Sequence, residues 1–91
     1  MIYRSKIDII AVILKTASND GGVLKSKIMY EGYLSWNQLK EYLSIVLKND
    51  LLKYQEREGS FVITGKGIRF LNIHNELNKL FTTTTASMWN S

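Results

Sequence analysis

Cysteine and proline are both absent from the 91-residue sequence, and histidine occurs once, at His74. Without cysteine, the chain can form neither a disulfide scaffold nor a thiolate metal site. With one histidine, a zinc site would need an unusual set of carboxylates, and no Ser-His-Asp or Cys-His catalytic arrangement can be argued. We therefore expect no metal, no cofactor and no enzymatic activity, and we expect His74 to lie on the surface or at a dimer seam.

Long apolar runs are also missing. The longest unbroken run, Ile9 to Leu14, is far shorter than the roughly 20 residues that span a bilayer. Arg4 and Lys6 resemble the basic start of a secretory signal, but Asp8 interrupts the apolar stretch that follows. The sequence thus predicts no membrane partner and a cytoplasmic protein, and it identifies no small-molecule substrate.

Apolar residues and a small basic excess are what the sequence does contain. Apolar residues make up 45% of the chain, and 12 Lys+Arg against 8 Asp+Glu leave a formal net charge of +4. This length suits one domain with one modest core, which we expect over residues 1–81. Residues 82–91 include four consecutive threonines and show no periodicity, so they are expected to form a flexible tail. The basic excess suits a polyanionic partner, although solvated lysines are common on any protein surface.

Two helices are predicted in the first third of the chain. Ser5 occupies the position of an N-cap, and apolar residues recur at helical spacing from Ile7 to Ala17. This helix is apolar on more than one side, which a one-core amphipathic helix would not need. Residues 19–22 end it, and a short second helix is expected over Val23–Tyr30, with Gly32 as its C-cap.

A third helix, a hairpin and a fourth helix are predicted in the remaining sequence. Ser35 and Gln38 fit a capping box, which starts a helix that runs to about Lys48. Two strand-like segments flank the polar, glycine-ended turn at 55–59 and indicate a β-hairpin. A last helix follows over 65–81. This order predicts a mainly helical α+β fold, the winged helix-turn-helix, in which the hairpin is the wing.

Several local motifs also agree with this fold. The segment from Lys27 to Leu43 has an Ile-Met-Tyr helix end, then Leu-Ser-Trp, then Gln-Leu. Leu51-Leu52 precedes the wing, and Ile63-Thr64-Gly65-Lys66-Gly67 follows it. With these motifs, about residues 5–81 resemble the small archaeal winged-helix DNA-binding proteins. The resemblance implies a winged helix-turn-helix fold, DNA binding and dimerisation through the last helix.

The third helix is the part expected to read DNA. With Leu39 and Leu43 facing the core, a rotation of about 100° per residue turns Asn37 and Glu41 outward. Asn and Gln can pair with adenine edges in the major groove, Glu can accept from cytosine, and free N–H groups of a first helical turn can hold a phosphate. The alternative is that this is merely a capped, solvated first turn. The candidate DNA contacts on this helix are Ser35, Asn37, Gln38, Lys40 and Glu41.

Basic residues outside the third helix are candidate phosphate contacts, which position a protein without specifying sequence. Each of them could equally be an ordinary surface residue. Two glutamates beside Arg57 weaken the wing as a minor-groove probe. The candidate phosphate contacts outside the third helix are Lys25, Lys27, Lys53, Arg57, Arg4 and Lys6.

Trp36 could stack on DNA or cover the edge of the core, and its helical angle favours packing.

The last predicted helix carries two apolar stripes. Ile68 and Leu71 can pack on their own domain. The second stripe follows the 3-4-3 spacing of a short coiled-coil seam, and a monomer of this size would not readily bury it together with the second face of the first helix. A homodimer is therefore predicted, and the alternative is that the stripe packs on the first helix of the same chain. The predicted dimer interface consists of Phe70, Ile73, Leu77 and Leu80.

Taken together, these features favour a homodimeric protein that binds double-stranded DNA. It would insert the third helix into the major groove and act as a transcription regulator or a nucleoid-associated protein. The alternative is a winged-helix protein-interaction module without direct DNA binding, because the net charge is only +4 and the wing is acidic.

Overall fold

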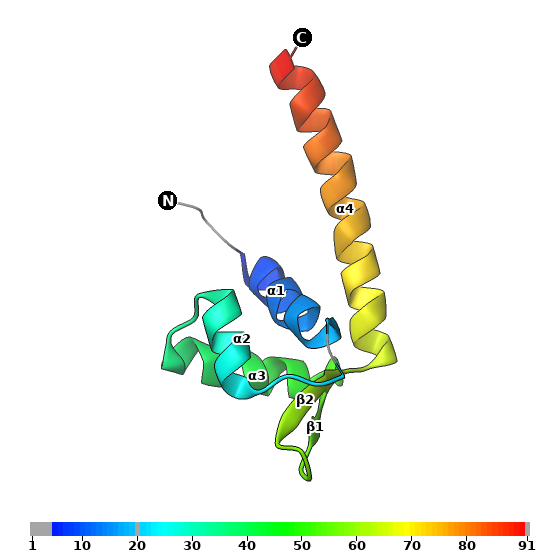
Figure 1. The fold of residues 1–91 in the computed structure, drawn as a ribbon. Coiled ribbons are helices and arrows are strands. Elements are labelled where there is room, and N and C mark those ends of the chain that lie inside the picture. The colour runs from blue at the N-terminus through cyan, green and yellow to red at the C-terminus, as the bar shows by residue number, and fades with distance from the viewer. Residues whose placement is uncertain (1–4, 20, 91) are drawn as a thin grey trace.

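A computed structural model describes the backbone of residues 5–19 and 21–90 and the side chains of this range up to Leu80. Helices α1, α2 and α3 and the hairpin gather into one cluster, and α4 extends past α1 away from it (Figure 1). The predicted mainly helical fold with a β-hairpin wing is confirmed. The elements in chain order are α1 (Lys6–Ser18), α2 (Lys25–Gly32), α3 (Trp36–Lys48), β1 (Leu52–Gln55), β2 (Ser60–Ile63) and α4 (Gly65–Asn90).

Helix α1 lies at the centre of the molecule, in contact with α2, β2 and α4. A capping box fixes its start: the Asp8 N–H donates to Ser5 Oγ at 3.1 Å, and the Ser5 N–H donates to the Asp8 carboxylate at 3.3 Å. Ile13 and Leu14 are both 0% exposed, and Ile9 is buried as well. The second apolar face of α1 is therefore covered by the chain's own elements, and it needs no partner subunit.

The start of α2 differs from the prediction. Val23 is not helical, because its N–H donates to the Phe61 carbonyl at 2.9 Å and its carbonyl accepts from the Phe61 N–H at 2.7 Å. This pair forms an isolated antiparallel bridge beside β2. Leu24 serves as the N-cap of α2 and is exposed. A single bridging residue has no periodicity of its own, so spacing could not reveal it.

The C-cap of α2 also lies one residue later than expected. Tyr33, at φ 54° and ψ 44°, takes the left-handed position that was assigned to Gly32. The Tyr33 N–H donates to the Tyr30 carbonyl at 3.3 Å and the Leu34 N–H donates to the Met29 carbonyl at 3.0 Å, which is the pattern of a Schellman motif. Gly32 stays within the helix, where an added Cβ would lie 3.2 Å from Leu34 Cγ. A side chain at this position would therefore require Leu34 to shift by a few tenths of an ångström.

Helix α3 and the hairpin follow the prediction. The Gln38 N–H donates to Ser35 Oγ at 3.2 Å and the Ser35 N–H donates to Gln38 Oε1 at 3.0 Å, so the expected capping box is present. Strands β1 and β2 pair antiparallel, with Leu52 opposite Ile63 at one end of the ladder and Gln55 opposite Ser60 at the other.

The junction between the hairpin and α4 explains the Thr-x-Lys-Gly motif. The Thr64 hydroxyl accepts from the Gly67 N–H at 3.0 Å. It can donate its one proton to the carbonyl oxygen of Asp50, 2.5 Å away, or to that of Leu51, 3.1 Å away. The Leu51 carbonyl also accepts from the Thr64 N–H at 3.1 Å. A Cβ on Gly67 would lie only 2.3 Å from that oxygen and 2.7 Å from Ile63 Cγ1. The motif therefore sets how closely the first turn of α4 approaches the hairpin.

Helix α4 continues to Asn90, past the end expected at residue 81. The threonine run carries no helical apolar spacing, so periodicity gave no sign that the backbone stays helical there. The flexibility of 82–91 remains a prediction, and Ser91 lies outside the described residues. Within 5–19 and 21–90, no helix is both long and apolar enough to cross a membrane.

Replacing Gly67 with alanine should destabilise the protein, although alanine normally stabilises a helix by about 1 kcal/mol relative to glycine. The added methyl group meets backbone oxygen, which cannot move aside without disturbing the start of the hairpin. We expect a loss of roughly 1–3 kcal/mol in urea unfolding. Gly65→Ala is the matched control, because a Cβ at that position would have no other atom within 4 Å, and it should be neutral or stabilising. Equal stabilities of the two variants would contradict the junction described here.

Candidate nucleic-acid interface

The first half of α3 presents a polar surface to solvent. Leu39 and Leu43 are buried, whereas Asn37, Lys40 and Glu41 are exposed. The division into a core side and an outer side is therefore the one that the spacing predicted. Whether these side chains contact DNA stays a prediction.

Gln38 is more constrained than the sequence suggested. It is exposed, but its Oε1 accepts from the Ser35 N–H in the capping box. A bidentate contact with adenine uses both the oxygen and the nitrogen of the amide, and the bond to the cap fixes the direction in which the Gln38 amide points. Asn37 has no such bond to any described residue, which makes it the better candidate for reading a base.

Trp36 does not pack at the edge of the core as expected. Its side chain is 51% exposed. The Nζ of Lys25, from α2, lies 5.3 Å from the ring centroid, and the Nζ of Lys40 lies 5.9 Å from it. The helical angle favoured packing, but an angle alone cannot show whether another element covers the ring. The structure thus joins Lys25, Lys40 and Trp36 into one exposed cluster.

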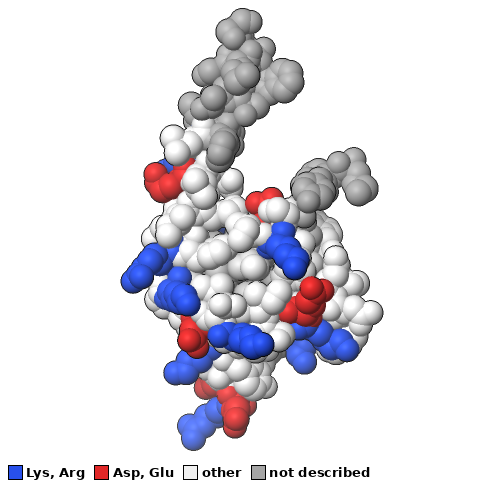
Figure 2. Space-filling model, turned by 180° about the vertical axis from the view of Figure 1, so that it is seen from behind, with Lys and Arg blue, Asp and Glu red and all other residues white. Residues whose placement is uncertain are grey.

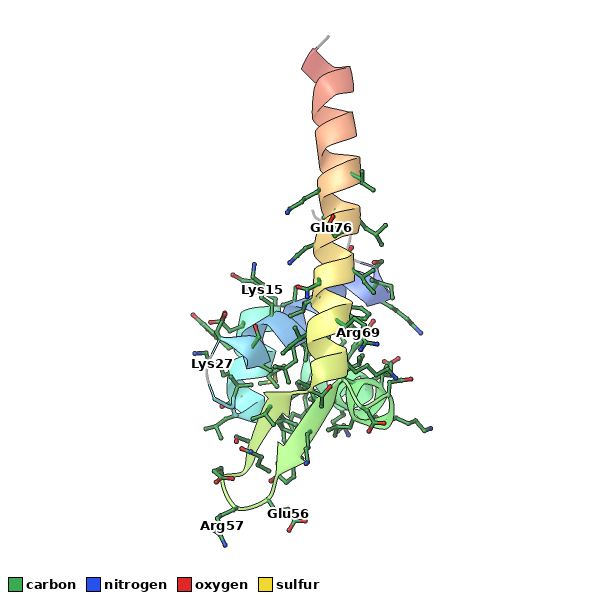
Figure 3. The ribbon with its side chains drawn as sticks, turned by 90° about the vertical axis from the view of Figure 1, so that its right-hand side faces the viewer. Lys15, Lys27, Glu56, Arg57, Arg69 and Glu76 are labelled. Atoms are coloured by element: carbon green, nitrogen blue, oxygen red, sulfur yellow. The ribbon has the colours of Figure 1, made fainter. Side chains whose placement is uncertain are left out.

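The remaining basic candidates are spread over the surface. Lys53 is exposed on β1, and Arg57 lies beside Glu56 at the tip of the hairpin, well away from the helices (Figure 3). Lys27 is exposed on α2 and Lys6 at the start of α1; Arg4 lies outside the described residues. Seen from behind, the surface carries basic and acidic side chains interspersed (Figure 2). No single basic patch on that face marks a DNA site.

Comparison with known proteins identifies the fold described above. The sequence matches the winged helix-turn-helix family over residues 3–82. The chain belongs to this family. It is 33% identical over 79 residues to an uncharacterized protein of Methanocaldococcus jannaschii, MJ0290, and the match covers 87% of this chain but only 36% of that protein. The chain thus spans about a third of the length of this relative.

A solved structure shows the same fold. Sso10a-2, a DNA-binding protein from Sulfolobus solfataricus, superimposes with a TM-score of 0.81 at 17% sequence identity, over 96% of this chain and 92% of that one. At this identity the likeness establishes the architecture. The resemblance to small archaeal winged-helix proteins, first indicated by local motifs, is confirmed.

The predicted dimer stripe divides into two parts. Phe70 is partly buried, packs against the core and stacks on His74, with ring centroids 6.4 Å apart and planes 8° apart. Ile73, Leu77 and Leu80 are 56%, 47% and 66% exposed. The start of the stripe therefore packs on the chain itself, and the rest is uncovered by described residues. That a second copy covers this remaining part stays a prediction.

A residue of α1 extends this exposed apolar surface. Ile7, which spacing placed among the residues of the buried face, is half exposed in the first turn of α1. A shallow cavity of about 270 Å³ is lined by Ile7, Phe70, Ile73, His74 and Leu77. Ile68, expected to pack on its own domain, is instead exposed, whereas Leu71 does pack against the core.

A polar pocket of about 210 Å³ lies beside this cavity, between α1 and α4. His74 Nε2 lies 3.1 Å from Asp8 Oδ1, and Asn78 Nδ2 lies 3.4 Å from His74 Nδ1. The hydrogen bond from His74, followed by those from Ser5, lowers the pKa of the Asp8 carboxyl below its usual value. His74 is therefore mainly a link between two helices. In the described part of the chain, no three His, Cys, Asp or Glu residues gather as metal ligands would.

Asp8→Asn should lower the stability of the protein at neutral pH. Because folding depresses the pKa of Asp8, its charge stabilises the folded state above the usual carboxyl range and ceases to do so as the pH falls through the folded pKa. Wild type should therefore have the higher midpoint in urea unfolding at pH 7, and the difference should shrink below about pH 4. Glu58→Gln, at the exposed wing, is the control and should change little. A difference independent of pH would show that the charge of Asp8 is not what stabilises the helix contact.

Proposed function

We propose that this winged-helix protein binds double-stranded DNA with α3 in the major groove and acts as a homodimer. The observation that carries the proposal is the exposed N-terminal half of α3, held by a capping box with its polar residues outward. In helix-turn-helix proteins this part of the recognition helix contacts base edges. The architecture it shares with Sso10a-2, described as a DNA-binding protein, supports the same use.

Residues around α3 supply the remaining contacts in this proposal. Asn37 reads a base edge, Lys40 and Lys25 contact phosphates beside it, and the hairpin places Lys53 and Arg57 against the neighbouring backbone. Ser35 caps α3, whose first-turn N–H groups suit phosphate, and Lys27, exposed on α2, adds an ammonium group. Glu41 discriminates by repelling phosphate or by accepting from cytosine.

The exposed apolar side of α4 supports the homodimer. Three large aliphatic side chains, Ile73, Leu77 and Leu80, lie on it at spacings of four and three, and Ile7 widens it at one end. Covering these side chains with the same surface of a second copy would remove them from water, at roughly 25 cal/mol per Å². A dimer would also present two copies of α3 to one duplex, as a transcription regulator or a nucleoid-associated protein requires.

Binding to a random-sequence duplex should weaken steeply with salt. The log–log slope of affinity against salt should be about −0.9 for each phosphate neutralised. Lys40→Ala and Lys53→Ala should each make the slope shallower by about one, whereas Lys79→Ala, far along α4, should leave it unchanged. Fluorescence anisotropy between 25 and 300 mM salt (roughly the range over which phosphate contacts are lost) measures this. Absence of duplex binding at low salt would overturn the proposal and favour a protein-interaction module.

The dimer is tested separately, by sedimentation. Leu77→Asp should convert the protein to a monomer, because a carboxylate cannot be buried in an apolar contact without a partner. Asn72→Asp introduces the same charge at an exposed position of α4 outside the apolar set and should leave the dimer intact. Wild-type protein that sediments as a monomer at micromolar concentration would contradict the interface.

A further inference from the structure

Three large aromatic side chains are exposed at the turn between α2 and α3. Tyr30, in the last turn of α2, is 80% exposed, Tyr33, at its C-cap, is 87% exposed, and Trp36, at the start of α3, is 51% exposed. They recur every third residue through the turn. We call these three residues, with Lys25 and Lys40, the aromatic turn surface. Three exposed aromatic side chains in one short segment mark a candidate binding surface.

Tyr33 adds to this because glycine would serve the fold better at its position. A bulky residue at φ 54° is strained, and backbone strain of this kind concentrates at functional sites. The Schellman bonds hold the backbone there and bury Leu34 beneath the turn. The Tyr33 ring gains nothing from this arrangement within the chain: it makes no ring contact or hydrogen bond with any described side chain. The strained backbone conformation of Tyr33 thus leaves an aromatic ring exposed to solvent.

The charges at this surface are placed around an aromatic face. Lys25 and Lys40 come from different helices, and their ammonium groups lie 5.3 and 5.9 Å from the Trp36 centroid. Each ammonium group ends a flexible stem. A flat ligand that stacks on the Trp36 ring can therefore displace an ammonium group from the face of the ring. The displaced ammonium group can then pair with a negative charge at the edge of the ligand. Between Lys25 and Lys40, the one acidic residue in the sequence is Glu31, which is exposed on α2.

We propose that the aromatic turn surface binds single-stranded nucleic acid, with unpaired bases stacked on Tyr33 and Trp36 and the adjoining phosphates held by Lys25 and Lys40. A duplex offers base edges in its grooves, while the flat faces of its bases are stacked on one another. Unpaired bases offer those faces to aromatic side chains, and their backbone attracts lysine. This function goes beyond the proposed duplex binding and does not require it.

The test compares single-stranded and duplex ligands on the full chain by fluorescence anisotropy. The probes are labelled oligo(dT), oligo(rU) and a random-sequence duplex of equal length. Wild type should bind the single strands, and Trp36→Ala should weaken this by roughly 5- to 150-fold, the effect of one stacked base. Tyr33→Phe keeps the ring and should bind as wild type does. Comparison of oligo(dT) with oligo(rU) shows whether DNA or RNA is preferred.

Tyr33→Gly separates loss of stacking from loss of folding. Glycine suits a left-handed C-cap, so this variant should be at least as stable as wild type in urea unfolding, yet it should lose single-strand affinity. Its duplex affinity should change much less. The proposal is overturned if wild type does not bind the single strands, if Tyr33→Gly binds them as well as wild type, or if the variants lose duplex and single-strand binding equally. The last outcome would assign the rings to the duplex interface.

Discussion

Burial of α1 on several sides is the constraint on which the rest of the structure depends. Ile13 and Leu14 are fully enclosed, and α2, β2 and α4 all pack against this one helix. Helix α3 is held instead through its contacts with α2 and β1, so its polar side remains on the surface of the cluster. The central helix thus leaves the candidate reading helix free of packing on the side where a ligand would approach.

Helix α4 combines two tasks along its length. At its start, Gly67 fits against the Leu51 carbonyl, and farther on Phe70, Leu71 and His74 attach the helix to α1. On another side of the same helix, Ile73, Leu77 and Leu80 are exposed. The attached and exposed parts lie on one continuous helix. A contact between two copies through α4 would therefore fix the position of each copy's α3 relative to the other.

Elements with strong local signals could be predicted from the sequence, and elements decided by distant contacts could not. Both capping boxes involve residues three apart, so Ser5 and Ser35 marked the starts of α1 and α3 correctly. Val23 pairs with Phe61, far along the chain, and no local pattern could distinguish it from the first residue of α2.

The candidate site shows the same division. The rotation of about 100° per residue correctly placed Asn37 and Glu41 on the side of α3 away from the core. It could do so because helical rotation depends only on neighbouring residues. The exposure of Trp36 depends on which elements surround it, and its lysine neighbour on α2 is not apparent from spacing. Tyr33 was overlooked because an adjacent glycine, Gly32, matched the expected cap better than tyrosine does.

The measurement that tests duplex binding by α3 most directly is an NMR titration of the ¹⁵N-labelled protein with a DNA duplex. If α3 enters the major groove, the largest amide shift changes should fall in residues 35–41 and at the wing tip, and the α4 amides beyond Ile73 should shift least. Changes concentrated on α4 and the first turn of α1, with residues 35–41 unaffected, would contradict the central claim.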